Sequence, residues 1–339
     1  MKFGIFDHVD DSGLPPAEHM AARLEMVEAF EAAGFHAYHV AEHHGTPLGH
    51  APSPAVYLAA VSQRTTRLRF GPLVFLLPLY HPLRLIEEVG MLDALSGGRL
   101  ELGYGRGVSP VEMGFYGVDR DEQAERMIET FDVLMQGMTS DRLTHQGRFF
   151  RFDDVPMLQR PVQQPHPPLW YGTNTPGSAA RCAQQRLNML TLLSGEVPRT
   201  MMQDYRDAYR ASGGEEAEMP FIGVGRHIVV ADSDEEALAI ARPAFARWRA
   251  SFVQLWEARG AMNPFVAATP QDWDALEARG AACAGSPDTV RAFIAREAET
   301  VSFNYYTAQL AFGDMTVAQV RRSAELFGAE VMPAFAAQG

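Results

Sequence analysis

The sequence contains almost no lysine, because Lys2 is the only one and every other basic residue is an arginine. Enzymes that form a Schiff base and proteins that carry a Walker-type phosphate loop both need a lysine in the site. Lys2 precedes the first expected strand, so both classes are nearly excluded. Any phosphate group must then be bound by arginine, by hydroxyl groups or by backbone N–H groups.

Cysteines and long apolar runs are also scarce. Cys182 and Cys283 lie far apart and form neither a CxxC pair nor a zinc-ligand spacing, which favours a reducing cytoplasm. No apolar stretch reaches the roughly 18 residues that span a bilayer, and Lys2–Phe6 is too short for a signal peptide. The net charge of −13, without a basic tract, opposes binding to nucleic acid and anionic membranes. We expect a soluble, cytoplasmic protein.

Short apolar runs alternate with segments of helical periodicity along the whole chain. Eight of these runs are expected to be strands, namely Lys2–Asp7, Ala37–Ala41, Leu68–Leu77, Arg99–Tyr104, Leu169–Gly172, Asn188–Leu192, Phe221–Val230 and Val301–Tyr306. Strands that alternate with helices indicate a parallel sheet. The pattern predicts an α/β protein with a single (β/α)₈ TIM barrel over residues 1–339, rather than an open doubly wound sheet.

Two segments interrupt this alternation. Residues 142–168 contain a hairpin-like stretch, His145–Phe152, followed by prolines that forbid a helix, so we expect a hairpin insertion before the fifth strand. Residues 260–284 are rich in alanine and glycine and lack a clear periodicity. We expect them to form a long, lid-like loop before the eighth strand.

In such a barrel the reactive residues lie at the carboxyl ends of the strands. Read in chain order, these ends carry Asp7-His8, Glu42-His43-His44, Leu73–Leu77, Gly105-Arg106-Gly107 and Gly172–Ser178. We therefore expect several histidines, one arginine and a hydroxyl-rich turn around a single opening.

The turn Asn174–Ser178 and Arg106 are candidates for binding an anion. A turn of this composition that enters a helix offers N–H groups, hydroxyls and the positive end of the helix dipole to a phosphate. The turn could equally be an ordinary helix cap, and Arg106 could equally form a structural salt bridge. The glycines of Gly103–Gly107 lack the third glycine of a dinucleotide-binding loop, so no nicotinamide site is expected.

Glu42-His43-His44 could bind a metal, act in acid–base chemistry or be structural. Adjacent histidines in a strand point to opposite sides, so one tetrahedral metal would not readily take both. We expect no metal site and favour an acid–base or hydrogen-bonding histidine.

At these residues the sequence resembles the bacterial luciferase family of flavin-dependent monooxygenases. The matching pieces are Lys2-Phe3-Gly4, Glu42-His43-His44, Leu77-Pro78, His81-Pro82-Leu83-Arg84, Gly98-Arg99, Arg106-Gly107, Ala183-Gln184, Gly285-Ser286-Pro287 and Val331-Met332-Pro333. No single motif is decisive, but the set occurs in the family's order over nearly the whole chain and is specific.

The resemblance implies that reduced FMN binds at the carboxyl end of the barrel and reacts with O₂ to form a C4a-hydroperoxide. It implies that His43 is the catalytic histidine, with His44 beside it, and that Arg106 binds the flavin phosphate. The remaining flavin-binding positions that it implies are Asn174, Thr175 and Ser178 in the phosphate and ribityl turn, and a non-proline cis peptide between Leu73 and Val74 beneath the isoalloxazine. The luciferase has a carboxylate at Asn174 and a cysteine at Gly105, so the resemblance does not carry over light emission.

These observations predict an FMN-dependent, two-component monooxygenase. A separate NAD(P)H:flavin reductase would supply FMNH₂, and Phe6, Phe75, Leu76 and Phe115 would form apolar walls. By analogy, the substrate would be a small, largely apolar aldehyde or ketone, and the chain would form a homodimer. The alternatives are a deazaflavin (F420)-dependent oxidoreductase on the same barrel, a flavin-binding protein without catalysis and, more distantly, a metal-dependent hydrolase.

Overall fold

A parallel barrel forms the centre of the computed structural model, which describes residues 1–262 and 264–336. Around the barrel the strands follow one another as β1 (Lys2–Asp7), β2 (Ala37–Val40), β3 (Arg69–Pro72) continued by β4 (Phe75–Leu76), β5 (Leu102–Gly105), β8 (Leu169–Gly172), β9 (Asn188–Thr191), β10 (Ile222–Val230) and β12 (Tyr305–Gln309). All neighbours are parallel, and a bridge between Phe70 and Leu100 joins β3 to the start of β5. The predicted α/β barrel fold is confirmed.

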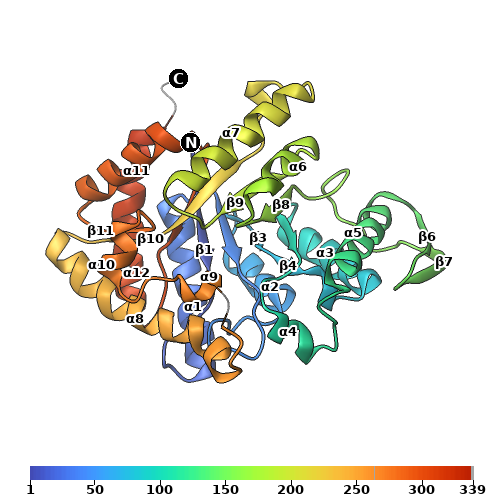
Figure 1. Ribbon diagram of the computed structural model, residues 1–339, viewed down its shortest axis with the longest axis horizontal. Helices are drawn as coiled ribbons and strands as arrows, with labels where there is room; N and C mark the ends of the chain where they lie inside the picture. The colour runs from blue at the N-terminus through green and yellow to red at the C-terminus, as the bar shows by residue number, and fades with distance from the viewer. Residues whose placement is uncertain (263, 337–339) are drawn as a thin grey trace.

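Helices surround the barrel on its outside (Figure 1). They are α1 (Pro16–Ala33), α2 (Pro54–Arg64), α3 (Pro82–Ser96), α4 (Pro110–Phe115), α5 (Gln123–Thr139), α6 (Ala179–Gln184), α7 (Glu196–Ala211), α8 (Asp234–Ala258), α11 (Pro287–Val301) and α12 (Val317–Leu326). Shorter helical turns are η1 (Leu77–Leu79), η2 (Pro176–Ser178), η3 (Glu216–Glu218), η4 (Phe327–Val331) and η5 (Met332–Phe335). Within the described chain, no helix has the length and apolar character that a membrane span requires.

Side chains that point inward fill the barrel towards the amino ends of its strands. Trp170 and Tyr305 pack there with ring centroids 4.8 Å apart, and the Tyr305 hydroxyl lies 2.8 Å from His39 Nε2. Towards the carboxyl end, the strands β5 and β8 end in Gly105 and Gly172, and the Val74 side chain lies against both.

The hairpin predicted within residues 142–168 is present. β6 (Arg142–Gln146) pairs antiparallel with β7 (Arg151–Pro156) and lies apart from the barrel at the right of Figure 1. The proline-rich segment that follows contains no helix and includes a cis peptide between Gln164 and Pro165.

The prediction of one long loop over residues 260–284 is wrong, apart from residue 263, which lies outside the described residues. The segment contains α9 (Pro264–Ala267), α10 (Trp273–Ala278) and β11 (Ala282–Gly285). The strand β11 pairs with the carboxyl-terminal half of β10. The buried Trp273 ring stacks on Phe312 at 6.1 Å and explains this order, because it anchors α10 to the core. 

The predicted start of the eighth strand, at Val301, is also wrong. Val301 ends α11, and Ser302 adopts a left-handed conformation before β12 begins at Tyr305. The left-handed turn at Ser302 separates the helix from the strand, so the apolar Val301 belongs to the helix.

Candidate active site

The structure brings the carboxyl-terminal strand ends together as predicted. His8 follows β1, Glu42–His44 follow β2, and the ring centroids of His8 and His43 lie 5.7 Å apart in a stacked arrangement. Arg106 follows β5, and the Asn174–Ser178 turn follows the neighbouring strand β8. No group of three described His, Cys, Asp or Glu side chains is arranged to hold a metal ion.

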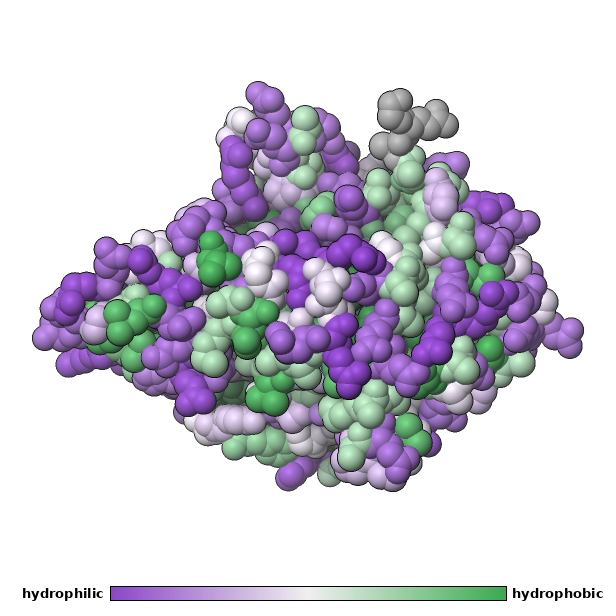
Figure 2. Space-filling view, turned by 180° about the vertical axis from the view of Figure 1, so that it is seen from behind, coloured by the Kyte–Doolittle hydropathy of each residue, from purple (hydrophilic) through white to green (hydrophobic). Residues whose placement is uncertain are grey.

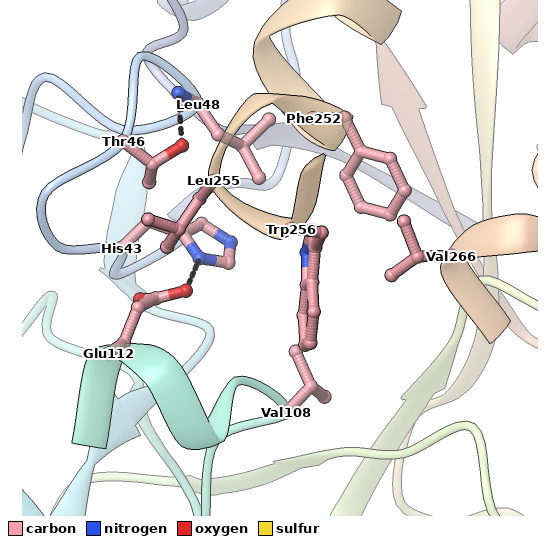
Figure 3. Close-up of a pocket in the computed structure, with 9 residues that line it drawn as sticks. All are labelled: His43, Thr46, Leu48, Val108, Glu112, Phe252, Leu255, Trp256 and Val266. Carbon is pink, nitrogen blue, oxygen red and sulfur yellow. Dashed lines mark hydrogen bonds and ion pairs between the residues drawn. The ribbon is translucent and has the colours of Figure 1, made fainter. Parts of the chain in front are cut away.

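His43 is oriented by a carboxylate that the sequence did not reveal, Glu112 on α4. Glu112 is 4% exposed; its Oε1 lies 3.3 Å from His43 Nδ1, and its Oε2 accepts a 2.9 Å hydrogen bond from the His44 backbone N–H. Ser109 Oγ accepts from the Glu112 N–H and so caps the short helix that carries this carboxylate. A buried carboxylate on one ring nitrogen fixes the orientation of the imidazole, while the other nitrogen faces the cavity in Figure 3.

The cavity beside His43 is mostly apolar, and its polar side chains are His43, Thr46 and Glu112. Its volume is about 30 Å³, and its lining consists of His43, Thr46, Leu48, Val108, Glu112, Phe252, Leu255, Trp256 and Val266. Figure 3 shows the imidazole and the Glu112 carboxylate on one side and the rings of α8 on the other. Ligand pockets usually measure roughly 300–1,000 Å³, so an organic substrate requires the side chains of α4, α8 or α9 to move apart.

His44 has partners different from those of His43. Its Nε2 lies 2.8 Å from Glu42 Oε1, and its Nδ1 lies 2.8 Å from the hydroxyl of Tyr116. The second oxygen of Glu42 accepts hydrogen bonds from the Tyr80 hydroxyl at 2.9 Å and from the Leu76 N–H at 3.0 Å. Burial raises the pKa of Glu42, and the hydrogen bonds from His44, Leu76 and Tyr80 oppose that rise. This network ties the β2 loop to the segment after β4.

Replacing Tyr80 with Phe tests that network. The variant loses one donor to a buried carboxylate, so the free energy of unfolding should fall by about 1 kcal/mol. The donor favours the ionised form of Glu42, whose pKa is raised in the fold, so its loss should matter most above that pKa. Urea unfolding should therefore show a larger deficit at about pH 8 than at about pH 5. Tyr116→Phe, at a 53% exposed side chain, is the control, and an equal deficit in both variants would contradict the prediction.

The predicted cis peptide between Leu73 and Val74 is present and separates β3 from β4. Gly105 and Gly172 lie against the Val74 side chain, and a Cβ added at Gly105 would lie 2.7 Å from Val74 Cγ2. A cysteine at position 105, as in the luciferase, would therefore require Val74 to move. Glycine at these two positions therefore leaves room for the Val74 side chain that follows the cis peptide.

The Asn174–Ser178 turn is partly occupied by its own hydrogen bonds. Asn174 Oδ1 accepts from the Leu192 N–H at 3.0 Å, and Ser178 Oγ donates to the Thr175 carbonyl at 2.7 Å. Neither Thr175 nor Ser178 caps a helix through its side chain, so the turn is not an ordinary cap. Thr175 is exposed at the mouth.

Arg106 is exposed and has no ion pair or hydrogen bond with any residue in the described part of the chain. The alternative that it forms a structural salt bridge is therefore wrong. An unpaired guanidinium next to a hydroxyl-rich turn is suited to a bidentate contact with a phosphate.

The three phenylalanines predicted as apolar walls lie in different places. Phe6 belongs to the inner barrel cluster, 4.9 Å from the His8 ring, whereas Phe115 is 44% exposed and lies under the Arg259 guanidinium. The prediction for Phe75 is wrong: its side chain is fully buried in the outer core and packs edge-on against Tyr80. 

The apolar walls come instead from α8, through Phe252, Leu255 and Trp256. For Glu112, the Ser109–Glu112 spacing of a capping box was a signal that could have located the start of α4.

Comparison with known proteins gives consistent matches. The family described as luciferase-like monooxygenase matches residues 1–304. The uncharacterized protein y4wF of Sinorhizobium fredii is 41% identical over 93% of this chain and 92% of its own length. The oxygenase component of the flavin-dependent trigonelline monooxygenase of Acinetobacter baylyi is 28% identical over 70% of this chain and 67% of its own. The monooxygenase RslO1 of Streptomyces bottropensis superposes with a TM-score of 0.88, at 27% identity over 99% and 100% of the two chains.

The same barrel also occurs in proteins that use different cofactors. The oxygenating constituent of 3,6-diketocamphane monooxygenase from Pseudomonas putida, in complex with FMN, has a TM-score of 0.80 at 20% identity over 98% of both chains. An F420-dependent secondary alcohol dehydrogenase has a TM-score of 0.74 at 17% identity over 98% of both chains. These two likenesses show the fold alone, whereas the match over residues 1–304 and the 41% identical relative show that the chain belongs to the luciferase-like monooxygenase family.

Proposed function

We propose that this chain is the oxygenase of a two-component monooxygenase that uses reduced FMN and O₂ to oxidise a small, uncharged, largely apolar aldehyde or ketone. The observation that carries the proposal is the His43–Glu112 pair, whose imidazole faces an apolar cavity at the carboxyl end of the barrel. A single oriented acid–base group in a dry pocket is suited to a reaction whose reactive oxygen species must be kept from water.

The residues present fit reduced FMN. Arg106 is a free guanidinium for the phosphate, the Asn174–Ser178 turn follows the adjoining strand β8, and the Leu73-Val74 cis peptide lies at the carboxyl end of β3, where we place the flat ring. When bound, reduced FMN would supply the electrons that activate O₂. His43 would donate or accept the proton at its cavity-facing nitrogen, and Glu112 would hold the ring in position.

The cavity lining supports the proposed substrate class. The described residues of the lining include no arginine or lysine, and the carboxylate among them, Glu112, would repel an anionic substrate. The sequence offers no nicotinamide-binding loop, so we propose that a separate NAD(P)H:flavin reductase delivers the reduced flavin.

An anaerobic titration with reduced FMN and with reduced F420 tests the proposal, followed by admission of air while absorbance is recorded. We expect tight binding of reduced FMN and an absorbance transient that differs from both reduced and oxidised flavin. Preference for F420 without a transient would replace oxygen insertion by hydride transfer. Binding of flavin without any reaction would favour a carrier protein.

We also propose a homodimer, formed through the outer surface of α2 and α3. Val56 on α2 is 73% exposed, and Met91 and Leu95 on α3 are 54% and 51% exposed. Leu158 and Val162, which follow the hairpin, are 91% and 55% exposed, and Val162 lies over Gly98 at the end of α3. Figure 2, the view from behind, shows purple and green side chains mixed over that face. Exposed apolar side chains on two helices that contact each other are candidates for a protein interface.

Sedimentation of a Met91→Glu, Leu95→Glu double variant tests the dimer. Two buried charges in an apolar contact are strongly unfavourable, so the variant should sediment as a monomer while the wild type sediments as a dimer. Leu14→Glu, at a 45% exposed leucine elsewhere, is the control and should remain dimeric. A monomeric wild type would overturn the proposal.

A further inference from the structure

Two polar side chains meet inside the barrel, near the carboxyl ends of two neighbouring strands. His227 on β10 and Gln309 on β12 are direct partners in the register of these parallel strands. Side chains alternate between the two faces of a strand, so Gln309 points to the same side of β12 as Thr307 and Tyr305. Tyr305 faces the barrel interior, and Gln309 therefore faces inward too. His227 Nδ1 and Gln309 Nε2 lie 3.3 Å apart, and the side chains are 5% and 4% exposed.

Nε2 of His227 and Oε1 of Gln309 are buried and have no hydrogen-bond partner of normal geometry among the described residues, and the Gln309 amide lies close enough to His8 to oppose the lowering of that histidine's pKa. If the amide N–H donates to Nδ1, the imidazole N–H and the amide oxygen are left over. If the amide is turned and accepts from Nδ1–H, the imidazole lone pair and the amide NH₂ are left over. In both arrangements the pair presents one free donor and one free acceptor.

The surroundings of the pair are aromatic and electrically neutral. The His227 ring lies 4.6 Å from Trp248, 5.0 Å from Phe312 and 5.7 Å from Phe245. Burial lowers the pKa of His227 to about 3, so the ring is neutral at physiological pH. Burial and the neighbouring His43 also hold the pKa of His8 well below its usual range. 

A charged ligand group would find no counter-ion beside the pair. Arg23, the nearest cation that affects His8, is bound by the carboxylates of Asp7 and Asp10. Unpartnered buried polar atoms are costly, which is a reason to look for a ligand that satisfies them.

The pair is connected to the reaction site through rings. Trp248 Nε1 donates to His8 Nδ1 at 3.4 Å, and His8 stacks on His43. Trp248 also stacks on Phe252, at 5.1 Å and 10°, and Phe252 lines the cavity. Neither residue of the pair lines the cavity, so a molecule bound there with its other end near His43 would have to part the Trp248–Phe252 stack.

We propose that the His227–Gln309 pair is a binding subsite for an uncharged hydroxyl group on an otherwise apolar substrate, at a position remote from the carbon that is oxidised. A hydroxyl oxygen both donates and accepts, so one group satisfies both free atoms. The inference rests on the proposed function, because it concerns the substrate of that reaction, and it assigns these residues to substrate selection.

Calorimetric titration with three matched ketones tests the subsite: 4-hydroxyacetophenone, 4-methoxyacetophenone and acetophenone. Only the first has a group that both donates and accepts. The wild type should bind it about tenfold more tightly than the other two, as expected when one hydrogen-bonded group is lost. In the His227→Phe, Gln309→Met double variant that preference should fall below about twofold, while the affinity for reduced FMN is unchanged.

The matched control is Thr130→Val on α5, which also removes a buried unpartnered polar atom but lies outside the site. It should keep the full preference. Equal binding of the three ketones by the wild type, binding of none, or a preference that survives the double variant would each overturn the subsite. The wild-type comparison decides even where the double variant is unstable. If the protein prefers the hydroxylated ketone but does not bind reduced FMN, the subsite is supported and the proposed function is contradicted.

Discussion

Replacing His43 with Ala should reduce turnover by about 10²–10⁴-fold and leave the affinity for reduced FMN within about twofold. Among the described residues that line the cavity, His43 alone has an imidazole, and Glu112 holds it. Alanine would leave the cavity walls and the proposed flavin-binding residues unchanged. It would remove the side chain that we propose donates or accepts the proton. Stopped-flow measurement of product formation, alongside the anaerobic titration, separates the two effects.

Glu112→Gln is the companion variant, because it keeps the size of the side chain and removes its charge. It should retain more activity than His43→Ala but less than the wild type, since an amide replaces the negative charge that holds the ring in position. His166→Ala, in the proline-rich loop after the hairpin, is the control histidine. Unchanged turnover in His43→Ala would remove the proposed role. Equal turnover by the wild type and Glu112→Gln would remove the carboxylate from that role.

The sequence predicted the barrel because its strands are short apolar runs whose alternation with helices is local information. It failed where tertiary packing decides the structure. Trp273 orders α10 by stacking on Phe312, which lies about 40 residues further along the chain, and no local periodicity contains that contact. β11 forms only because β10 is long enough to pair with it beyond the barrel.

The candidate site divides in the same way. His43 and Arg106 were predictable because parallel strands bring their carboxyl ends to one opening. Glu112 and Trp256 were not, because they reach the cavity from helices whose placement depends on packing. Phe75 shows the limit of reasoning from strands: it lies one residue after the cis peptide, and its side chain faces the outer core.

Replacing Arg106 with Ala should weaken binding of reduced FMN by about 10–100-fold, the range expected for losing a charge-assisted hydrogen bond to phosphate. The effect should be absent for reduced riboflavin, which has the same ring and ribityl chain but no phosphate. This comparison separates a phosphate contact from a general disturbance of the mouth, because the latter would weaken both flavins.

Arg67→Ala is the matched control for Arg106→Ala. Arg67 is exposed and lies before β3, at the amino end of the barrel. Both substitutions remove one positive charge, so a long-range electrostatic effect on the binding of an anionic flavin would appear in both variants. If both variants weaken FMN binding alike, or if Arg106→Ala weakens riboflavin equally, Arg106 is not the phosphate ligand. A selective loss for FMN in Arg106→Ala would locate the phosphate beside β5 and orient the flavin with its ring towards Leu73-Val74 and His43.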